Sequence, residues 1–164
     1  MMLYITYGTV HYLIKLVEAH PDLNLRLMTN ENTGILFHET DGKTIFNEPK
    51  SYEVLDSNGS LTAGSFAVFH HIPVSHEGKP LFEKLFSDRA RIIEKQQGFS
   101  AIRVLRPTKN DTYIILTLWE KEQYYKAWVE SDSYNEAYHK GLQEKSSFLQ
   151  PSFVKKYYAI SLEA

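Results

Sequence analysis

The first part of the chain alternates hydrophobic and polar residues in short segments, and this pattern predicts β-strands. In residues 23–28, leucines at 23, 25 and 27 alternate with Asn24 and Arg26, which is the two-residue period of a half-buried strand. Residues 3–8 and 33–40 are rich in β-branched and aromatic residues, and a D-G turn followed by residues 44–48 completes a predicted hairpin. Residues 11–20 carry apolar positions at three- and four-residue spacing, which predicts a short helix ended by the following proline.

The second part of the chain has the element order of a ferredoxin-like unit. The pattern predicts strands at residues 66–74, 99–107, 112–120 and 153–160, and helices at residues 77–95, 122–130 and 133–141. In the long helix Leu81, Leu85 and Ile92 recur at helical spacing between charged residues, which predicts an amphipathic helix. Ser133 and Glu136 have the spacing of a capping box, which predicts a new helix start. The order β-α-β-β-α-β predicts an α+β fold.

Two unequal halves follow from this organisation. Residues 1–60 are expected to form an N-terminal partial ferredoxin-like half, and residues 65–164 a C-terminal ferredoxin-like domain. Residues 48–64 are rich in Pro, Ser, Asn and Gly around a brief extended segment, so the joint is expected there. The two halves share an element order and no convincing sequence repeat.

Composition and charge exclude several classes of function. The chain has 18 basic and 20 acidic residues, so nucleic acid is a poor candidate partner. It has no cysteine, which excludes disulfides, thiolate metal sites and cysteine nucleophiles. The sequence lacks a signal peptide and any apolar run long enough to span a membrane, so a cytoplasmic protein without membrane insertion is expected. Motifs of serine hydrolases, P-loop NTPases, zincins and dinucleotide-binding enzymes are absent.

Several motifs resemble one family when they are taken together. They are GFSAIRVLRP, TYIILTLWE and the W-x-x-S-x-S-Y-x-E-A stretch in the second half, with MLYITYGT, HETDGKTIF and YEV in the first. This combination resembles the antibiotic biosynthesis monooxygenase (ABM) superfamily, and within it the longer haem-degrading monooxygenases of the HmoB type and the TRAP proteins, targets of an RNAIII-activating protein. The resemblance implies a barrel in which the partial N-terminal repeat replaces the second subunit of shorter, IsdG-type enzymes. Such a pseudo-dimer is expected to be a monomer or a weak dimer.

The same resemblance implies a set of site residues. The short haem-degrading relatives carry an Asn on the first strand, a Trp on the last helix and a His ten residues after it. The Asn position falls on His70, the Trp is present as Trp128, and the His position falls on Tyr138, with His139 next to it. His70 and Trp128 are therefore the implied catalytic residues. Trp128, Tyr138 and His139 are the implied haem-binding residues, and either His139 or Tyr138 is the iron ligand.

Each of these residues also has a purely structural interpretation. Trp128 on an amphipathic helix is equally consistent with a core position. On the strand 66–74, His70 and His71 must point to opposite sides, one towards helices and one towards the barrel interior, and each is consistent with a buried neutral imidazole. Arg103 and Arg106 are candidates for holding a propionate, although the pattern favours a surface position for both.

Three functions remain open at this stage. The first is a haem-degrading monooxygenase, in which haem is both cofactor and substrate, iron is released and electrons come from an external donor. The second is a TRAP-like protein that uses the same barrel for signal transduction or stress response without turnover. The third is a small-molecule monooxygenase that needs no cofactor, as the resemblance to shorter members of the superfamily implies.

Overall fold

The computed structural model describes residues 1–31, 33–138 and 152–160, apart from the side chains of Glu136 and Tyr138. The elements in chain order are β1 (Met2–Gly8), α1 (Val10–Ala19), β2 (Leu25–Thr29), β3 (Gly34–Thr40), β4 (Lys50–Asn58), β5 (Phe66–Pro73), a 3-10 turn (His76–Gly78), α2 (Lys79–Ile93), β6 (Phe99–Pro107), β7 (Thr112–Trp119), α3 (Glu122–Val129), α4 (Asp132–Tyr138) and β8 (Phe153–Ala159). The predicted β-α-β-β-α-β order of the second half is therefore confirmed.

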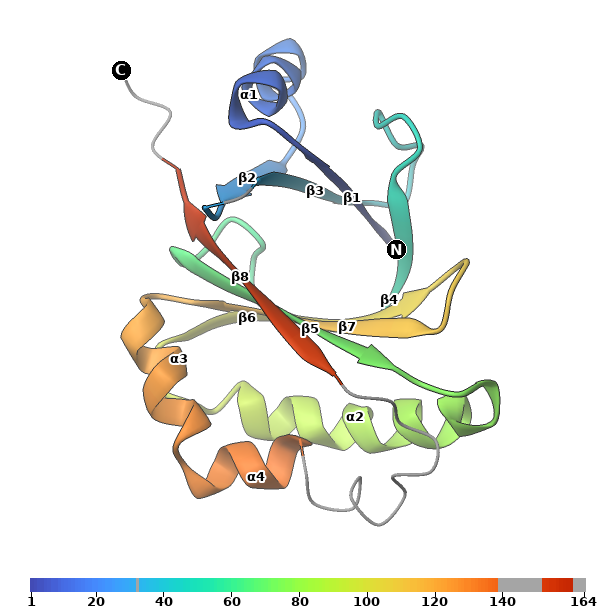
Figure 1. The fold of residues 1–164 in the computed structure, drawn as a ribbon, viewed down its shortest axis with the longest axis vertical. Coiled ribbons are helices and arrows are strands. Elements are labelled where there is room, and N and C mark those ends of the chain that lie inside the picture. The colour runs from blue at the N-terminus through green and yellow to red at the C-terminus, as the bar shows by residue number, and fades with distance from the viewer. Residues whose placement is uncertain (32, 139–151, 161–164) are drawn as a thin grey trace.

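The strands form a closed antiparallel barrel in the order β1-β3-β2-β8-β5-β7-β6-β4. Figure 1 shows α2, α3 and α4 as a layer on one side of this barrel, and α1 at its opposite end. The two halves meet at two seams, β4 with β6 and β2 with β8. Among the described residues the second seam is short, with two pairs, Met28 with Ala159 and Thr29 with Tyr158. The α+β ferredoxin-like fold predicted from the sequence is confirmed, whereas the division at residues 60–65 and the pseudo-dimer remain predictions.

The first half differs from the predicted pattern at two places. Residues 44–48 form no strand, so the predicted second arm of the hairpin is wrong. Phe46 from this segment packs instead with Leu13 of α1 and the outer face of the sheet. The segment expected to be a joint contains the nine-residue strand β4, which pairs with both β1 and β6. Barrel closure requires this strand, and its alternation is hidden by the surrounding Ser and Asn residues.

Helix α2 is amphipathic, as predicted, and it buries its phenylalanines more deeply than the three apolar residues that the spacing singled out. Phe82, Phe86, Ala90 and Ile93 are its buried residues, while Leu81, Leu85 and Ile92 lie at the edge of that face. Aromatic rings bury more apolar area than leucine, so the face with the phenylalanines is the one that packs on the sheet. Helix α4 begins at Asp132, so Ser133 lies in its first turn and not at the N-cap position.

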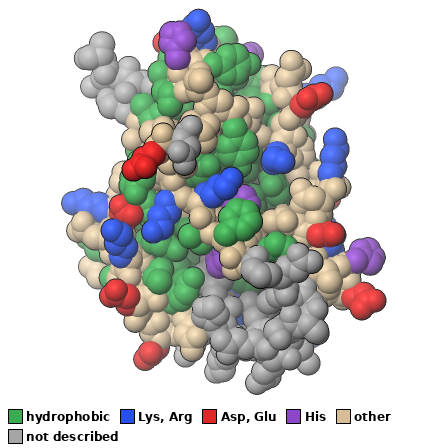
Figure 2. Space-filling model, viewed as in Figure 1, with side chains coloured by type: hydrophobic (Ala, Val, Ile, Leu, Met, Phe, Trp, Pro, Cys, Tyr) green, Lys and Arg blue, Asp and Glu red, His purple; other side chains and the backbone are tan. Residues whose placement is uncertain are grey.

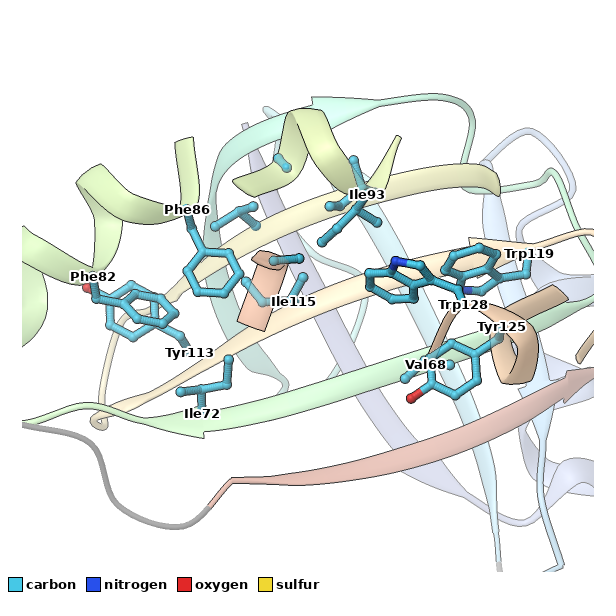
Figure 3. Packing of buried hydrophobic residues seen from close by; sticks show 14 of the residues in the cluster. Val68, Ile72, Phe82, Phe86, Ile93, Tyr113, Ile115, Trp119, Tyr125 and Trp128 are labelled. Atoms are coloured by element: carbon cyan, nitrogen blue, oxygen red, sulfur yellow. The ribbon is translucent and has the colours of Figure 1, made fainter. Parts of the chain in front are cut away.

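Two hydrophobic clusters lie on opposite sides of the C-terminal half of the barrel wall. The first, the helix-side cluster, joins β5, β6 and β7 to the three helices and includes Phe82, Phe86, Trp119, Tyr125 and Trp128 (Figure 3). The second, the barrel-interior cluster, contains the inward side chains of the strands, such as Ile5, Phe37, Phe69, Leu116 and Tyr157. The barrel is thus filled by side chains over most of its length.

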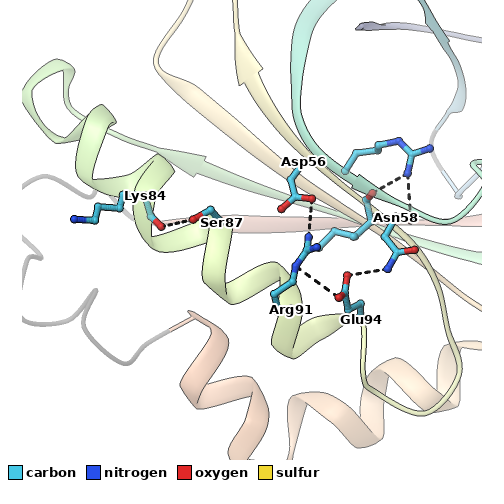
Figure 4. Close-up of polar contacts among 8 residues, drawn as sticks. Asp56, Asn58, Lys84, Ser87, Arg91 and Glu94 are labelled. Atoms are coloured by element: carbon cyan, nitrogen blue, oxygen red, sulfur yellow. Dashed lines mark hydrogen bonds and ion pairs between the residues drawn. The ribbon is translucent and has the colours of Figure 1, made fainter.

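Polar contacts tie α2 to the strand that closes the barrel. Arg91 reaches Asp56 of β4 at 2.6 Å, and the side-chain amide of Asn58 donates to Glu94 at 2.8 Å (Figure 4). These contacts connect the helical layer of the second half to a strand of the first half.

Candidate functional site

Strand β5 is a wall with a different environment on each side. His70 lies on the same side as Val68 and Ile72, which belong to the helix-side cluster. His71 lies on the side of Ala67 and Phe69, which face the barrel interior. Because the neighbours of His70 belong to one cluster and those of His71 to the other, the prediction that the two histidines point to opposite sides is confirmed.

His70 is positioned by a hydrogen bond from the neighbouring strand segment. Its Nε2 atom lies 2.9 Å from the hydroxyl oxygen of Ser152, immediately before β8, and the backbone of His70 pairs with Val154. The side chain is 8% exposed. The tautomer of the ring decides whether Nε2 donates or accepts this hydrogen bond, and the bond fixes the position of the imidazole.

Trp128 packs inside an aromatic cluster. It is 3% exposed, and its ring centroid lies 5.2 Å from that of Trp119, 5.0 Å from that of Tyr134 and 6.2 Å from that of Tyr125. Figure 3 shows the two indoles side by side, with Tyr125 on the same helix as Trp128. The contacts are those of a core residue, so Trp128 supports the side chains around it and contributes little surface of its own.

A cleft lies beside this aromatic cluster, between helices α3 and α4 and strand β8. We call it the helix-side cleft; it has a volume of about 390 Å³ and is lined by Tyr125, Lys126, Val129, Glu130, Tyr134, Val154 and Lys156. Its walls are mainly aromatic and aliphatic. The Lys156 ammonium lies 5.6 Å from the centre of the Tyr125 ring, so a cation stands at one wall.

The tyrosines of the cleft are neutral phenols. Burial, with a smaller effect of Tyr134, raises the pKa of Tyr125 to about 12. Burial also raises the pKa of Tyr134 above its ordinary value. Both rings therefore offer uncharged faces against which a flat, apolar ligand can pack.

The residues expected to ligate iron fall at the edge of the described chain. Tyr138 is the last residue of α4, and its side chain is not among the described ones. His139 lies outside the described residues. Within the described part of the chain, no three His, Asp or Glu side chains gather as a possible metal site. The choice between Tyr138 and His139 therefore stays a prediction.

The surface position favoured for Arg103 is wrong. Its guanidinium donates to both carboxylate oxygens of Glu39, at 2.6 and 3.1 Å, and the residue is 5% exposed. Arg103 points into the barrel because it lies on the same face of β6 as Ala101 and Leu105 of the barrel-interior cluster. An arginine held there on the barrel side of the wall does not reach the helix-side cleft.

Arg106 is also engaged, on the outer side of β6. It donates to Glu83 of α2 at 2.6 and 3.0 Å and to Glu53 of β4 at 2.9 Å. The Tyr113 hydroxyl donates to the same Glu83 carboxylate. The hydrogen bond from Arg106 is the largest effect that lowers the pKa of Glu83. Both arginines proposed for a propionate are thus neutralised by carboxylates.

Sequence reasoning missed Lys156, the cation of the helix-side cleft. The signal was present in the strand at residues 153–159, where two adjacent lysines follow an apolar pair. Because side chains alternate along a strand, adjacent lysines must point to opposite sides. One of them, Lys156, lines the helix-side cleft, and the other, Lys155, lines a different pocket.

In the described part of the chain, no helix has the length and apolar character needed to cross a membrane.

Comparison with known proteins places this fold among characterised relatives. Residues 65–140 match the family model of the antibiotic biosynthesis monooxygenases. Over 128 residues the chain is 27% identical to a heme-degrading monooxygenase of Listeria monocytogenes, covering 78% of this chain and 77% of that protein. Over 140 residues it is 29% identical to the signal transduction protein TRAP of Staphylococcus epidermidis, covering 85% of this chain and 84% of that one.

A solved structure, described as that of a major regulator of staphylococcal pathogenesis, is similar over the whole barrel. It superposes with a TM-score of 0.90 at 27% identity, covering 98% of this chain and 100% of that one. The resemblance predicted from the motifs is therefore confirmed.

Proposed function

We propose that this protein binds haem in the helix-side cleft and acts as a haem-degrading monooxygenase. Its residues 65–140 match the family model of the antibiotic biosynthesis monooxygenases. The observation that carries this proposal is the aromatic cleft between α3, α4 and β8, next to the strand that holds His70. The similarity to a heme-degrading monooxygenase of Listeria monocytogenes supports the choice of ligand.

The lining of the cleft fits a flat, mostly apolar ligand that carries acidic groups. Tyr125, Tyr134, Val129 and Val154 offer apolar surface, and the Lys156 ammonium offers a partner for a propionate carboxylate. The volume of about 390 Å³ lies in the range of roughly 300 to 1,000 Å³ typical of small-molecule pockets. A tetrapyrrole would lie partly exposed at the mouth of such a cleft.

The roles of the chain's own residues follow from their positions. His139 or Tyr138 would hold the iron, as the family resemblance implies. His70 would hold a proton at Nε2 close to the ligand, with Ser152 fixing the ring. Trp128 would act as a positioning residue, because it packs against Tyr134 and Tyr125, which line the cleft. Bound haem supplies the oxygen chemistry and is itself consumed, with electrons from an external donor.

Hemin titration tests the proposal directly. A saturable shift of the Soret band at one hemin per chain is expected for the wild type. Lys156→Glu should weaken binding, because it places a carboxylate beside a propionate. Lys155→Glu is the matched control, since the neighbouring lysine lies on the other side of the wall. Equal weakening by both variants, or no saturable shift, would contradict the proposed site.

Turnover needs a separate measurement. With ascorbate and air, loss of the Soret band and release of chelatable iron are expected, and removal of oxygen should stop both. Replacing His139 by Ala and Tyr138 by Phe identifies the ligand, because only the variant that lacks the iron ligand should change the spectrum of the complex.

A second function, a TRAP-like interaction protein without turnover, is favoured by one specific observation. Trp128 is almost fully enclosed by Trp119, Tyr125 and Tyr134, so it offers little surface to press on a tetrapyrrole. The similarity to the TRAP protein of Staphylococcus epidermidis is consistent with this function. Hemin binding without degradation, or no hemin binding, is the outcome expected for it. In either case we propose a monomer or weak dimer, because one chain closes its own barrel.

A further inference from the structure

A second pocket lies on the other side of the β5–β8 wall. We call it the barrel-mouth pocket; it has a volume of about 500 Å³, and its lining includes Tyr7, Lys50, His71, Phe153, Lys155 and Tyr157. These residues come from β1 and β4 of the first half and from β5 and β8 of the second. None of its described lining residues also lines the helix-side cleft.

The lining of the barrel-mouth pocket is cationic. Lys50 and Lys155 both line it, and its other described lining residues include no Asp or Glu. In the described part of the chain, neither lysine takes part in an ion pair. Two amines in a lining without a described carboxylate create a positive potential that attracts an anion. In the same view as Figure 1, Figure 2 shows histidine side chains in the middle of one face, among Lys or Arg and hydrophobic side chains.

His71 supplies an unused hydrogen-bonding atom at this place. The residue is 8% exposed, and its Nε2 atom has no hydrogen-bond partner among the described residues. Burial, followed by the charges of Lys155 and Lys50, lowers the pKa of His71 to about 4, so the ring is neutral at pH 7. A buried polar atom without a partner is costly, and a ligand that bonds to it recovers that cost.

The remaining walls are aromatic. The His71 ring stacks on Phe153 with centroids 4.6 Å apart and an angle of 5° between the planes. Phe153 is 48% exposed at the rim, and Tyr157 is buried at 1% exposure. The hydroxyl of Tyr157 is hydrogen-bonded to the side chain of Asn30, so Tyr157 offers the face of its ring to the pocket. The ammonium group of Lys155 lies 5.9 Å from the centre of the Tyr7 ring. Stacked rings next to free amines suit a ligand with a flat apolar body and an anionic group.

We propose that the barrel-mouth pocket is a second binding site, selective for small aromatic carboxylates. The carboxylate lies between Lys50 and Lys155 and accepts a hydrogen bond from Nε2 of His71, and the ring packs between Phe153 and Tyr7. Binding at this site is independent of haem, because the wall formed by β5 and β8 separates the two pockets.

Calorimetry with 2-naphthoate, and with the uncharged 2-naphthalenemethanol as a matched ligand, tests this site. The wild type is expected to bind the carboxylate saturably and the alcohol at least about tenfold more weakly, which corresponds to loss of one ion pair. Lys155→Glu and Lys50→Glu should each weaken naphthoate binding by about tenfold or more. Lys156→Glu is the control, since it changes the same charge one residue away on the opposite side of the wall.

Histidine variants provide a second, independent readout. His71→Ala should weaken naphthoate binding, while His70→Ala should leave it unchanged, because His70 faces the helices. The thermal midpoint of each variant verifies that it folds, and if His71→Ala does not fold, the lysine variants decide the outcome alone. No saturable naphthoate binding, equal affinity for the alcohol, or equal loss in Lys155→Glu and Lys156→Glu would each overturn the proposal.

Discussion

His71 lies parallel to Phe153, with ring centroids 4.6 Å apart, and this stack is on the opposite side of β5 from the hydrogen bond between His70 and Ser152. Two consecutive residues therefore serve two separate environments, a helix-side cleft and a barrel-mouth pocket. The same division recurs on β8, where Lys155 lines one pocket and Lys156 the other. Consecutive residues on paired strands thus provide matched control variants for each site.

The stability of the protein should fall on acidification because of His71. Its pKa is lowered from 6.5 to about 4 in the folded state, mainly by burial. Below about pH 6.5 the unfolded chain therefore binds a proton at His71, whereas the folded chain does not bind it until the pH falls to about 4. Stability should be complete above pH 6.5 and fall by at most about 3 kcal/mol as the pH approaches 4.

Urea unfolding at pH 7 and pH 4.5 measures this effect. The variant His71→Phe, which keeps an aromatic ring beside Phe153, should lose most of the difference between the two pH values. His11→Gln, at an exposed position, should not change it. A residual slope is expected from His38, whose pKa is also lowered by burial. An unchanged slope in His71→Phe would contradict the assignment.

Glu39→Gln should strongly destabilise the barrel. The Arg103 side chain is 7% exposed, and among the described residues its guanidinium also donates to the backbone carbonyls of Asn58 and Ile102. Removing the carboxylate leaves a buried guanidinium without a counter-charge, which costs about 3 to 5 kcal/mol. Guanidinium-induced unfolding measures the loss.

A matched control is the exposed pair on the outer side of the same strand. Glu53→Gln removes a partner of Arg106, whose side chain is 39% exposed, and should cost less than about 1 kcal/mol. The double variant Glu39→Leu with Arg103→Met should be more stable than Glu39→Gln, because no buried charge remains. Similar losses in Glu39→Gln and Glu53→Gln would show that the barrel interior does not penalise the unpaired charge.

Trp128→Ala should cost about 3 to 5 kcal/mol of folding free energy, since it opens a cavity between Trp119 and Tyr134. Trp128→Phe should cost less because a ring remains. Tyr12→Ala, at a side chain 55% exposed on α1, is the control and should stay within about 0.5 kcal/mol. If Trp128→Ala kept full stability and lost hemin binding, Trp128 would be a wall of the haem site and not a core residue.

Gly98→Ala should destabilise the connection between α2 and β6. Gly98 has φ of +80°, and an added Cβ would lie 2.2 Å from Cγ of Tyr124. A positive φ with a side chain costs about 1 to 3 kcal/mol, and the contact with Tyr124 adds to it. Gly42→Ala is the control, because its nearest atom is 3.5 Å away, on Thr40. Thermal unfolding of the two variants compares them, and equal midpoints would contradict the strained turn.

Local patterns in the sequence predicted much of the fold. Alternation and helical spacing placed most of the described strands and the helices α1, α2, α3 and α4, because these periods depend on neighbouring residues alone. Helical spacing did not identify which apolar residues of α2 are fully buried, since Leu81 and Leu85 repeat as regularly as Phe82 and Phe86. Spacing along one helix does not reveal which of two apolar stripes meets the larger partner surface.

The local pattern is enough to predict that His70 and His71, and likewise Lys155 and Lys156, point to opposite sides of their strands, because side chains alternate along an extended backbone. What lies on each side depends on the folded barrel. Closure of the barrel brings Lys50 of β4 to the same pocket as His71 and Lys155, and it pairs Arg103 with a glutamate 64 residues away. These contacts depend on strand order around the barrel, which no local period encodes.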